Sequence, residues 1–185
     1  MGVAAIFIED QAAPKKCGHM EGKRVIEQKS MVHKIEAACA ARENDDFFLL
    51  ARTDAIEPHG LRDALKRGAA YLEAGADGIY FEGATEVKQL EKIGQEFGKV
   101  PLAVSVLEGG GKTPWLPPAQ FFDLGFSMLL YPTSIKFRVS KTIAQAAKDL
   151  KNGREMPQSD ALNMTEFEEI VALQFWAQIE NKFPV

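Results

Sequence analysis

The sequence predicts an α/β protein that forms a partial (β/α)8 TIM barrel, about the last five strand–helix units, with an extra C-terminal helix. Short continuous apolar runs, typical of parallel strands covered on both faces, alternate with segments of helical periodicity. The five units recur at roughly 25–30 residues, and a complete barrel needs about 250 residues. A small doubly wound sheet is the competing architecture, but Glu9-Asp10-Gln11 follows the first strand where that fold usually has a glycine-rich phosphate loop.

Each predicted strand is an apolar run of four to seven residues that ends at polar residues or a turn signal. The five runs are Val3–Ile8, Phe47–Ala51, Gly78–Phe81, Val100–Val106 and Phe126–Tyr131. The intervening helices place apolar residues three or four positions apart on one face. They cover Lys29–Arg42, Gly60–Glu73, Thr85–Phe97, where Thr85 is the expected N-cap, and Thr133–Lys151, which stops at Asn152-Gly153. This alternation predicts right-handed βα units and a parallel sheet.

The chain is expected to have three parts. Residues 1–152 form the partial-barrel catalytic domain, residues 153–164 a polar linker, and residues 165–185 a C-terminal helix. Within that last part, Thr165–Lys182 is amphipathic and rich in aromatic residues, so its apolar face needs a partner surface. Two partners remain open: the chain's own barrel, or a neighbouring subunit with which the helix is exchanged.

Composition excludes several classes of protein. The 185 residues are 46% hydrophobic and 26% charged with a net charge of −4, which argues against nucleic-acid and anionic-membrane partners. No apolar run approaches the roughly 20 residues of a membrane span, and no signal peptide is recognised. Two cysteines, Cys17 and Cys39, provide neither a disulfide framework nor zinc spacing. The expected location is the cytoplasm or an organelle matrix.

The chemistry is expected where the strands end, because barrel enzymes carry their sites at the carboxyl ends of the strands. Carboxylates, an arginine and small hydroxyl groups follow the five predicted strands in turn, a set that suits an oxygen-rich anionic substrate held with a hard cation. These residues are Glu9 and Asp10, Arg52-Thr53-Asp54, Glu82-Gly83, Ser105 with Glu108–Thr113, and Thr133-Ser134.

The run Lys15-Lys16-Cys17-Gly18-His19 lies in the loop after the first strand. Neighbouring cationic groups favour the thiolate form of a cysteine, so Cys17 is a candidate for proton transfer. The alternative is a surface cysteine in a charged loop. His19 is expected to position the loop or contact substrate rather than ligate a metal, because no second histidine stands at ligand spacing.

Other site residues also have a structural interpretation. Arg52 and Glu82 are either substrate-binding groups or an ion pair across adjacent strands, and Glu9 is either near a metal or a supporting residue. The glycines at 109–111 form a plain turn or a flexible loop at the mouth of the site.

These motifs, in this order, resemble the isocitrate lyase/phosphoenolpyruvate mutase superfamily. The resemblance rests on Ile8–Gln11, Lys15–His19, Ala51–Ala55, Ala74–Asp77, Phe81–Gly83, Glu108–Gly110, Leu124–Phe126 and Tyr131-Pro132. It covers nearly the whole chain from Val3 to about Lys151, and the short gap between Gln11 and Lys15 is closer to the methylisocitrate lyase-like branch.

The resemblance implies a carbon–carbon lyase that uses Mg²⁺ or Mn²⁺. Such an enzyme cleaves a 2-hydroxy di- or tricarboxylate, similar to isocitrate, 2-methylisocitrate or dimethylmalate, into a 2-oxo acid and a dicarboxylate. It also implies a homo-oligomer, a tetramer in the intact family.

The family match assigns roles to residues of this chain. Cys17 is implied as the proton donor to the departing carbanion, with Lys16 and His19 beside it as catalytic residues. Substrate-binding roles are implied for Gly18, Arg52, Glu82, Ser105 and Thr133. Glu9 is implied to hold the metal through water.

Cys17 favours the lyase branch, because the mutase branch lacks a cysteine in this loop. The alternatives are a phosphonomutase or oxaloacetate-decarboxylase-type member, or a non-catalytic assembly remnant. Ser105 stands where the family commonly has Asn, which leaves the substrate open.

The family's first three strands, with a Ser-Gly substrate segment and the aspartates that ligate Mg²⁺ directly, have no counterpart here. The chain is therefore expected to be truncated at its N-terminal side and to have little activity alone.

Overall fold

The computed structural model describes residues 3–43 and 46–183. It divides into two compact units, Met1–Ile135 and Lys136–Val185, and each is described by itself. The first unit contains the sheet and all the strand ends at which the chemistry is expected.

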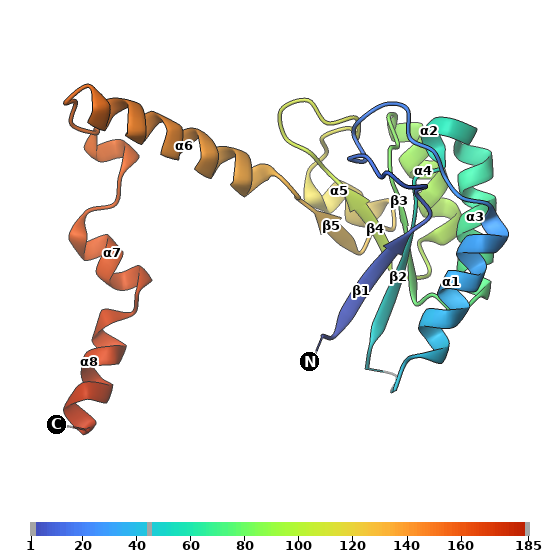
Figure 1. Cartoon of the computed structure of the whole chain (residues 1–185), viewed down its shortest axis with the longest axis horizontal. Helices are drawn as coiled ribbons and strands as arrows, with labels where there is room; N and C mark the ends of the chain where they lie inside the picture. Colours follow the sequence, from blue (N-terminus) through green and yellow to red (C-terminus); the bar gives the residue numbers. More distant parts are fainter. Residues whose placement is uncertain (1–2, 44–45, 184–185) are drawn as a thin grey trace. The chain divides into compact units, whose positions relative to one another are not determined.

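Five parallel strands form one sheet in which each strand pairs with the next along the chain (Figure 1). They are β1 (Ala5–Glu9), β2 (Phe48–Thr53), β3 (Gly78–Phe81), β4 (Leu102–Ser105) and β5 (Met128–Leu130). A doubly wound sheet reverses its strand order at a switch point, whereas the order β1-β2-β3-β4-β5 never reverses. The strands form a half-barrel, which confirms the predicted fold class.

Helices α1 (Gln28–Ala40), α3 (Leu61–Glu73) and α4 (Val87–Phe97) lie on the same side of the sheet (Figure 1). The main hydrophobic core lies between them and the sheet, because alternate strand residues point toward the helices. Its strand members are Leu49, Ala51, Ile79, Phe81, Leu102 and Val104. The helices contribute buried residues such as Met31, Ile35, Leu90 and Ile93.

The other set of alternate residues faces the inner side of the half-barrel. One line of register neighbours crosses the sheet there, since Glu9 is opposite Arg52, Arg52 opposite Tyr80, and Tyr80 opposite Ala103. A small second apolar cluster of Leu50, Tyr80 and Ala103 lies on this side. The inner face therefore presents charged and aromatic side chains toward the carboxyl ends of the strands.

Several elements differ from the expectation. The chain forms two short helices, α2 (Ile56–His59) and α5 (Pro118–Asp123), for which no helix was predicted. Helix α4 has Glu86 rather than Thr85 as its N-cap residue, and the Thr85 backbone N–H donates instead to Gln89 Oε1 at 2.7 Å. The expected N-cap was therefore wrong by one position.

The second unit consists of most of α6 (Ser134–Lys151), a 3₁₀ turn at Gln158–Asp160, and helices α7 (Met164–Ile170) and α8 (Leu173–Lys182). The single helix predicted over Thr165–Lys182 is thus divided into two. Ala172 separates them in the left-handed conformation, with a φ of 52°, which a continuous right-handed helix does not allow.

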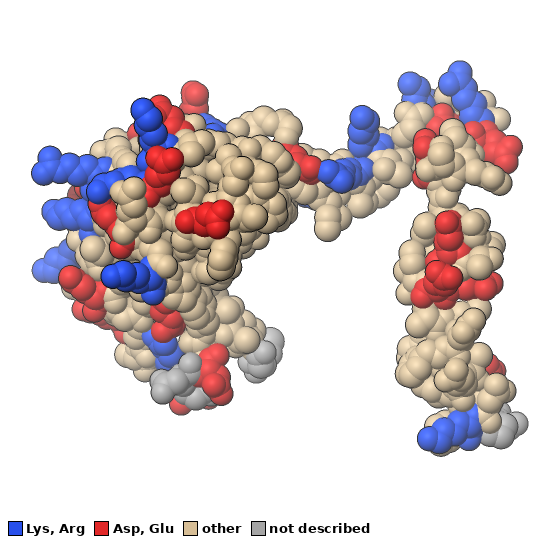
Figure 2. Space-filling view, turned by 180° about the vertical axis from the view of Figure 1, so that it is seen from behind, with Lys and Arg blue, Asp and Glu red and all other residues tan. Residues whose placement is uncertain are grey.

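Within the described ranges, no helix combines the length and the apolar character needed to cross a membrane. Positive and negative side chains are interspersed on the face of the molecule in Figure 2, without a continuous region of one sign.

Candidate active site

The carboxyl ends of β1, β2 and β3 bring Glu9, Arg52 and Glu82 together, as the strand-end pattern predicts. Arg52 Nε lies 3.3 Å from Glu9 Oε2, and Arg52 Nη2 lies 3.5 Å from Glu82 Oε2. Glu82 is only 2% exposed and Arg52 only 9%. The sheet therefore holds one guanidinium between two carboxylates in a largely dry environment.

Arg52 is itself fixed by two further groups. Its Nε and Nη2 donate to Asp54 Oδ2 and Oδ1 at 2.8 and 2.9 Å, a bidentate pair, and its Cζ lies 4.9 Å from the centre of the Tyr80 ring. Burial opposes its positive charge, but the hydrogen bonds to Asp54 and the neighbouring negative charges outweigh burial and raise the pKa of Arg52. Arg52 therefore stays charged, and its planar fork faces Asp54 more closely than Glu82.

Tyr80 contacts both Arg52 and Glu82. It lies on β3 and precedes Glu82 by two residues, so the two side chains point to the same face of the sheet. Its hydroxyl donates to Glu82 Oε2. Burial, followed by the charge of Glu82, raises the pKa of Tyr80, so its hydroxyl remains a donor. Ser105, 5% exposed at the end of β4, also lies within hydrogen-bonding reach of the Tyr80 hydroxyl.

The loop after β1 packs its glycine directly against Glu82. A Cβ built on Gly18 would lie 2.3 Å from Glu82 Cδ and 2.6 Å from Oε1, so only glycine fits this close approach. Cys17, the preceding residue, is exposed. Gly18 and Glu82 are thus in close contact, and Cys17 is the residue directly before this contact in the chain.

His19 lies on the other side of Gly18 and faces the same carboxylate. Its Nδ1 accepts a hydrogen bond from the backbone N–H of Lys112 at 3.1 Å, and its Nε2 lies 3.8 Å from Glu82 Oε1. The accepting Nδ1 carries no proton, so the proton of the neutral imidazole lies on Nε2. Nε2 and Glu82 Oε1 are both buried without a hydrogen-bond partner in the described residues.

The two lysines before Cys17 are occupied elsewhere. Lys15 Nζ pairs with Glu9 Oε1 at 2.5 Å, and Lys16 Nζ donates to the carbonyl of Glu21 at 3.1 Å. Gln11 holds Lys16 through two hydrogen bonds with its main chain, at 2.6 and 3.0 Å. Among the described contacts, the side chain of Lys16 meets neither Cys17 nor Glu82, so the structure does not bring it to the cluster.

Asp10 connects the end of β1 to the end of β2 and to helix α3. The sequence placed Asp10 among the strand-end residues but assigned it no role. Its fully buried carboxylate accepts hydrogen bonds from the Thr53 hydroxyl (2.8 Å), the Asp54 backbone N–H (2.9 Å) and the Tyr71 hydroxyl (2.8 Å). Arg67 lies 3.4 Å away. Burial and the charge of Asp10 raise the pKa of Tyr71. Asp10 thereby fixes the Arg52–Asp54 segment relative to β1 and α3.

Thr133 follows β5, where the sequence predicts it. Its hydroxyl is buried and has no hydrogen-bond partner among the described residues. No hydrogen bond among the described residues therefore connects its hydroxyl to the cluster at β1–β3.

The cluster does not form a complete direct metal site. Within the described residues, no group of three or more His, Cys, Asp or Glu side chains is placed to hold a metal ion. Glu9 Oε2 and Glu82 Oε1 are buried carboxylate oxygens without a hydrogen-bond partner, and Arg52 lies between these residues. The residues present therefore do not fit a directly ligated Mg²⁺.

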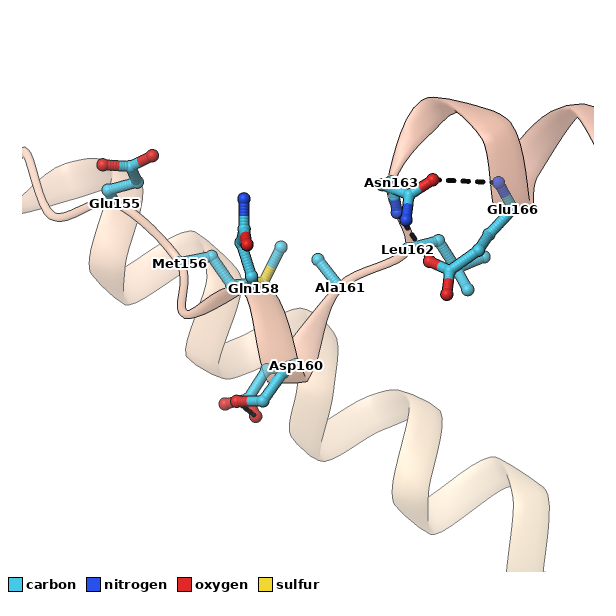
Figure 3. A pocket seen from close by; sticks show the side chains of 9 residues that line it. Glu155, Met156, Gln158, Asp160, Ala161, Leu162, Asn163 and Glu166 are labelled. Carbon is cyan, nitrogen blue, oxygen red and sulfur yellow. Dashed lines mark hydrogen bonds between the residues drawn. The ribbon is translucent and has the colours of Figure 1, made fainter.

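A separate hollow lies within the second unit (Figure 3). Two of its residues, Asn163 and Glu166, form a capping box at the start of α7, with hydrogen bonds of 3.0 and 2.9 Å. Its remaining lining residues are Glu155, Met156, Gln158, Ser159, Asp160, Ala161 and Leu162. Because the polar groups at Asn163 and Glu166 serve the helix end, this hollow lacks the converging groups found at β1–β3.

Sequence reasoning missed three residues that support the cluster or the loop against it: Tyr80, Lys23 and Glu57. The period of two along a strand would have indicated Tyr80, because it precedes Glu82 by two residues. No local pattern indicates Lys23 and Glu57, which are 34 positions apart and meet only in the fold.

Comparisons with known proteins identify the family of the chain. Residues 1–151 match the family model described as phosphoenolpyruvate phosphomutase. The 2,3-dimethylmalate lyase of Eubacterium barkeri is 36% identical over 184 residues, which are 98% of this chain and 63% of that protein. A 2-methylisocitrate lyase of Vibrio cholerae is 40% identical over 149 residues, 78% of this chain and 48% of that protein.

Solved structures match over nearly the whole chain. A crystal structure of 2,3-dimethylmalate lyase, described as a member of the PEP mutase/isocitrate lyase superfamily, has a TM-score of 0.83 at 27% identity and covers 99% of this chain. A phosphonopyruvate hydrolase in complex with oxalate and Mg²⁺ has a TM-score of 0.76 at 26% identity and covers 98%. The chain spans 61% and 63% of these two proteins.

Proposed function

Because the chain belongs to the phosphoenolpyruvate mutase/isocitrate lyase superfamily, we propose that it contributes to the cleavage of a carbon–carbon bond in a 2-hydroxy di- or tricarboxylate. The proposed substrates are of the dimethylmalate or methylisocitrate type, because two of its relatives are lyases named for these compounds. The products would be a 2-oxo acid and a second carboxylate.

One observation carries this proposal. Gly18 packs against Glu82 so closely that no side chain fits between them, and Glu82 lies 3.5 Å from Arg52. Cys17 and His19 flank that glycine in the chain. A carboxylate and a guanidinium therefore meet at the carboxyl ends of β1–β3, and the loop packed against that carboxylate carries a thiol and an imidazole. Bond cleavage with proton transfer uses groups of these kinds.

The proposed reaction is a retro-aldol cleavage. The hydroxyl group on C2 gives its proton to water, the C2–C3 bond breaks, and C2 becomes the carbonyl carbon of the 2-oxo acid. The electron pair of the broken bond stays on C3, next to a carboxylate, and Cys17 donates its thiol proton to that carbon. The Cys17 thiolate then takes a proton back from water, so no net proton is consumed. Arg52 supplies positive charge close to the carboxylate into which the carbanion is delocalised.

We also propose that the reaction uses Mg²⁺ or Mn²⁺, as the Mg²⁺ complex of the related hydrolase suggests. In this chain Glu9 is proposed to contact the metal only through water, because the described residues do not supply direct ligands.

We also propose that the chain forms a homo-oligomer through its second unit. A homo-oligomer fits the exposed apolar residues of the second unit, among them Ile170, Phe175 and Trp176, which are 66%, 55% and 59% exposed. Residues 165–185 are proposed as the segment that meets a neighbouring subunit, and residues 153–164 as the linker to it.

The proposal is tested by restoring the rest of a barrel. The 185 residues replace the matching segment of the Eubacterium barkeri 2,3-dimethylmalate lyase, and the hybrid is assayed with Mg²⁺ for release of a 2-oxo acid. We expect release from 2,3-dimethylmalate or 2-methylisocitrate. Release from the 185-residue chain alone should be at least about 100-fold slower, because its described residues form no group placed to ligate the metal directly.

Phosphonopyruvate is the matched alternative substrate in the same assay. Turnover of phosphonopyruvate, with none of either hydroxy acid, would contradict the lyase proposal and favour a mutase or hydrolase. A folded hybrid that turns over none of the three would instead favour a non-catalytic assembly role.

A further inference from the structure

Lys23 is a buried ammonium group in the loop that carries Cys17. Its side chain is fully buried, and its Nζ donates to the carbonyls of Gly18 (2.6 Å) and Met20 (3.0 Å) and to Glu57 Oε2. A lysine has three N–H donors, so all three are satisfied. Burying such a charge is unfavourable unless an opposite charge compensates it, and Glu57 provides that charge.

Glu57 lies in α2, directly after the Arg52–Asp54 segment, and joins three parts of the chain. Its Oε1 accepts the Gly22 backbone N–H at 2.7 Å, and its Oε2 contacts Lys23 and also lies 3.4 Å from Lys112 Nζ. Burial disfavours its charge, but the hydrogen bonds from Lys23 and Gly22 and the charges of Lys23 and Lys112 lower the pKa of Glu57 to about 2. The carboxylate is therefore ionised at neutral pH.

Lys112 lies in the loop after β4 and connects this loop to both His19 and Glu57. Its main-chain N–H donates to His19 Nδ1, while its side chain reaches Glu57. The segment Cys17–His19 is consequently held at two residues: Lys23 binds the Gly18 carbonyl, and Lys112 binds His19. No hydrogen bond or ion pair in the described structure links Glu57, Lys23 or Lys112 to Arg52 or Glu82.

We propose that Glu57 is a positioning residue that holds the Cys17–His19 segment against Glu82, acting through Lys23 and Lys112. Because Glu57 contacts Gly22, Lys23 and Lys112 rather than the segment itself, its charge sets where Cys17 lies and does not take part in binding at Arg52. The consequence for turnover rests on the proposed lyase function, but the consequence for the loop does not.

Hydrogen–deuterium exchange of the 185-residue chain tests the structural part. Glu57→Gln keeps an acceptor for the Gly22 N–H but removes the charge that Lys23 needs. We expect exchange in residues 12–26 to become about tenfold faster, while residues 48–53 of β2 are unchanged. Glu73→Gln, the same change at an exposed residue of α3, is the matched control and should leave both segments unchanged. Exchange in residues 12–26 equal to that of the control would overturn the proposal.

A second variant decides the question if Glu57→Gln unfolds the sheet as well. Lys112→Met keeps the main-chain bond to His19 and removes only the contact with Glu57. It should accelerate exchange in residues 12–26 and 107–114, and Lys112→Arg, which keeps the charge, should restore slow exchange. Unchanged exchange in Lys112→Met would contradict the role of Glu57.

Turnover of the hybrid enzyme separates positioning from a merely structural role. Glu57→Gln should lower kcat about tenfold and leave KM within about twofold, since Arg52 and Glu82 are untouched. Lys112→Arg should recover the kcat that Lys112→Met loses. A large rise in KM at unchanged kcat would refute the positioning role. An inactive wild-type hybrid would refute the lyase proposal, and hydrogen–deuterium exchange alone would then test whether Glu57 positions the loop.

Discussion

At the scale of single residues, buried carboxylates organise the site. Asp10 joins the end of β1 to Thr53, Asp54 and Tyr71, and Asp54 in turn holds Arg52. Each bond is made to a charged acceptor in a dry environment, where hydrogen bonds are strong and an unsatisfied group is costly.

Asp10→Asn should therefore be strongly destabilising. An amide can accept at one oxygen only. In one orientation its NH₂ group would face the Asp54 backbone N–H, and in the other it would face the hydroxyls and Arg67 that now donate to Asp10. We expect the free energy of unfolding to fall by about 3 kcal/mol in urea denaturation. Asp123→Asn, at an exposed position of α5, is the control and should change it by less than about 0.5 kcal/mol. Equal effects of the two substitutions would show that the Asp10 network contributes little.

Glu57 predicts a pH dependence of stability. Its pKa falls from the ordinary value of 4.5 to about 2 in the folded chain. A lowered pKa stabilises the folded state fully above the ordinary value, and that stabilisation is lost as the pH falls toward the folded value. The difference in unfolding free energy between wild type and Glu57→Gln should therefore be constant near neutral pH and shrink between about pH 4.5 and 2. A difference that does not change over this range would mean that Glu57 is not stabilised as an anion.

Arg52, Glu82, Gly18 and His19 were identified from the sequence because each follows a predicted strand or lies in a recognisable loop. Their convergence is confirmed by the structure, while their roles remain predictions. The supporting residues could not be identified in the same way. Glu57 and Lys23 are polar residues in separate loops, and only the path of the chain after β2 brings them together.

At the scale of elements, a glycine allows one helix to pack closely against the turn that precedes β5. Helix α4 presents Gly94 to the turn before β5, where a Cβ on Gly94 would lie 1.7 Å from the carbonyl oxygen of Leu124. The turn is held in place by backbone hydrogen bonds, including that from the Gly125 N–H to the Phe122 carbonyl at 2.8 Å. A side chain at residue 94 would have to move the whole helix.

Gly94→Ala should lower the free energy of unfolding by about 3 kcal/mol, although alanine favours a helix more than glycine does. Thermal denaturation followed by circular dichroism measures this. Lys92→Ala changes the exposed side of the same helix, where Lys92 pairs with Glu96 at 2.8 Å, and should cost less than about 1 kcal/mol. A stabilising effect of Gly94→Ala would mean that α4 is not packed as described.

Long buried elements could be predicted from the sequence, whereas short helices and a break within a helix could not. All five strands were predicted, because a buried parallel strand is a continuous apolar run. Helices α2 and α5 were not, because four and six residues are too few to show helical periodicity. The break at Ala172 was also missed, since alanine carries no signal for a left-handed residue.

At the scale of the whole molecule, the half-barrel leaves part of its inner side exposed. Phe7 on β1 is 51% exposed and contacts the Tyr80 ring edge-to-face at 6.3 Å. The supporting network around Asp10, Asp54 and Glu57 is nevertheless complete within the described chain. The fold class followed from the sequence, because the alternation of elements extends over the entire first unit, whereas the substrate did not, because no single residue determines it.

The most direct test of the central claim is the kcat of the hybrid enzyme with Cys17→Ser, measured beside Cys39→Ser. Cys39 is the matched control because its thiol donates to the Gly75 carbonyl at 3.2 Å and lies on α1, away from the strand ends. If Cys17 protonates the carbanion, Cys17→Ser should lower kcat at least about 100-fold while Cys39→Ser changes it little. Turnover by Cys17→Ser equal to wild type would contradict the account.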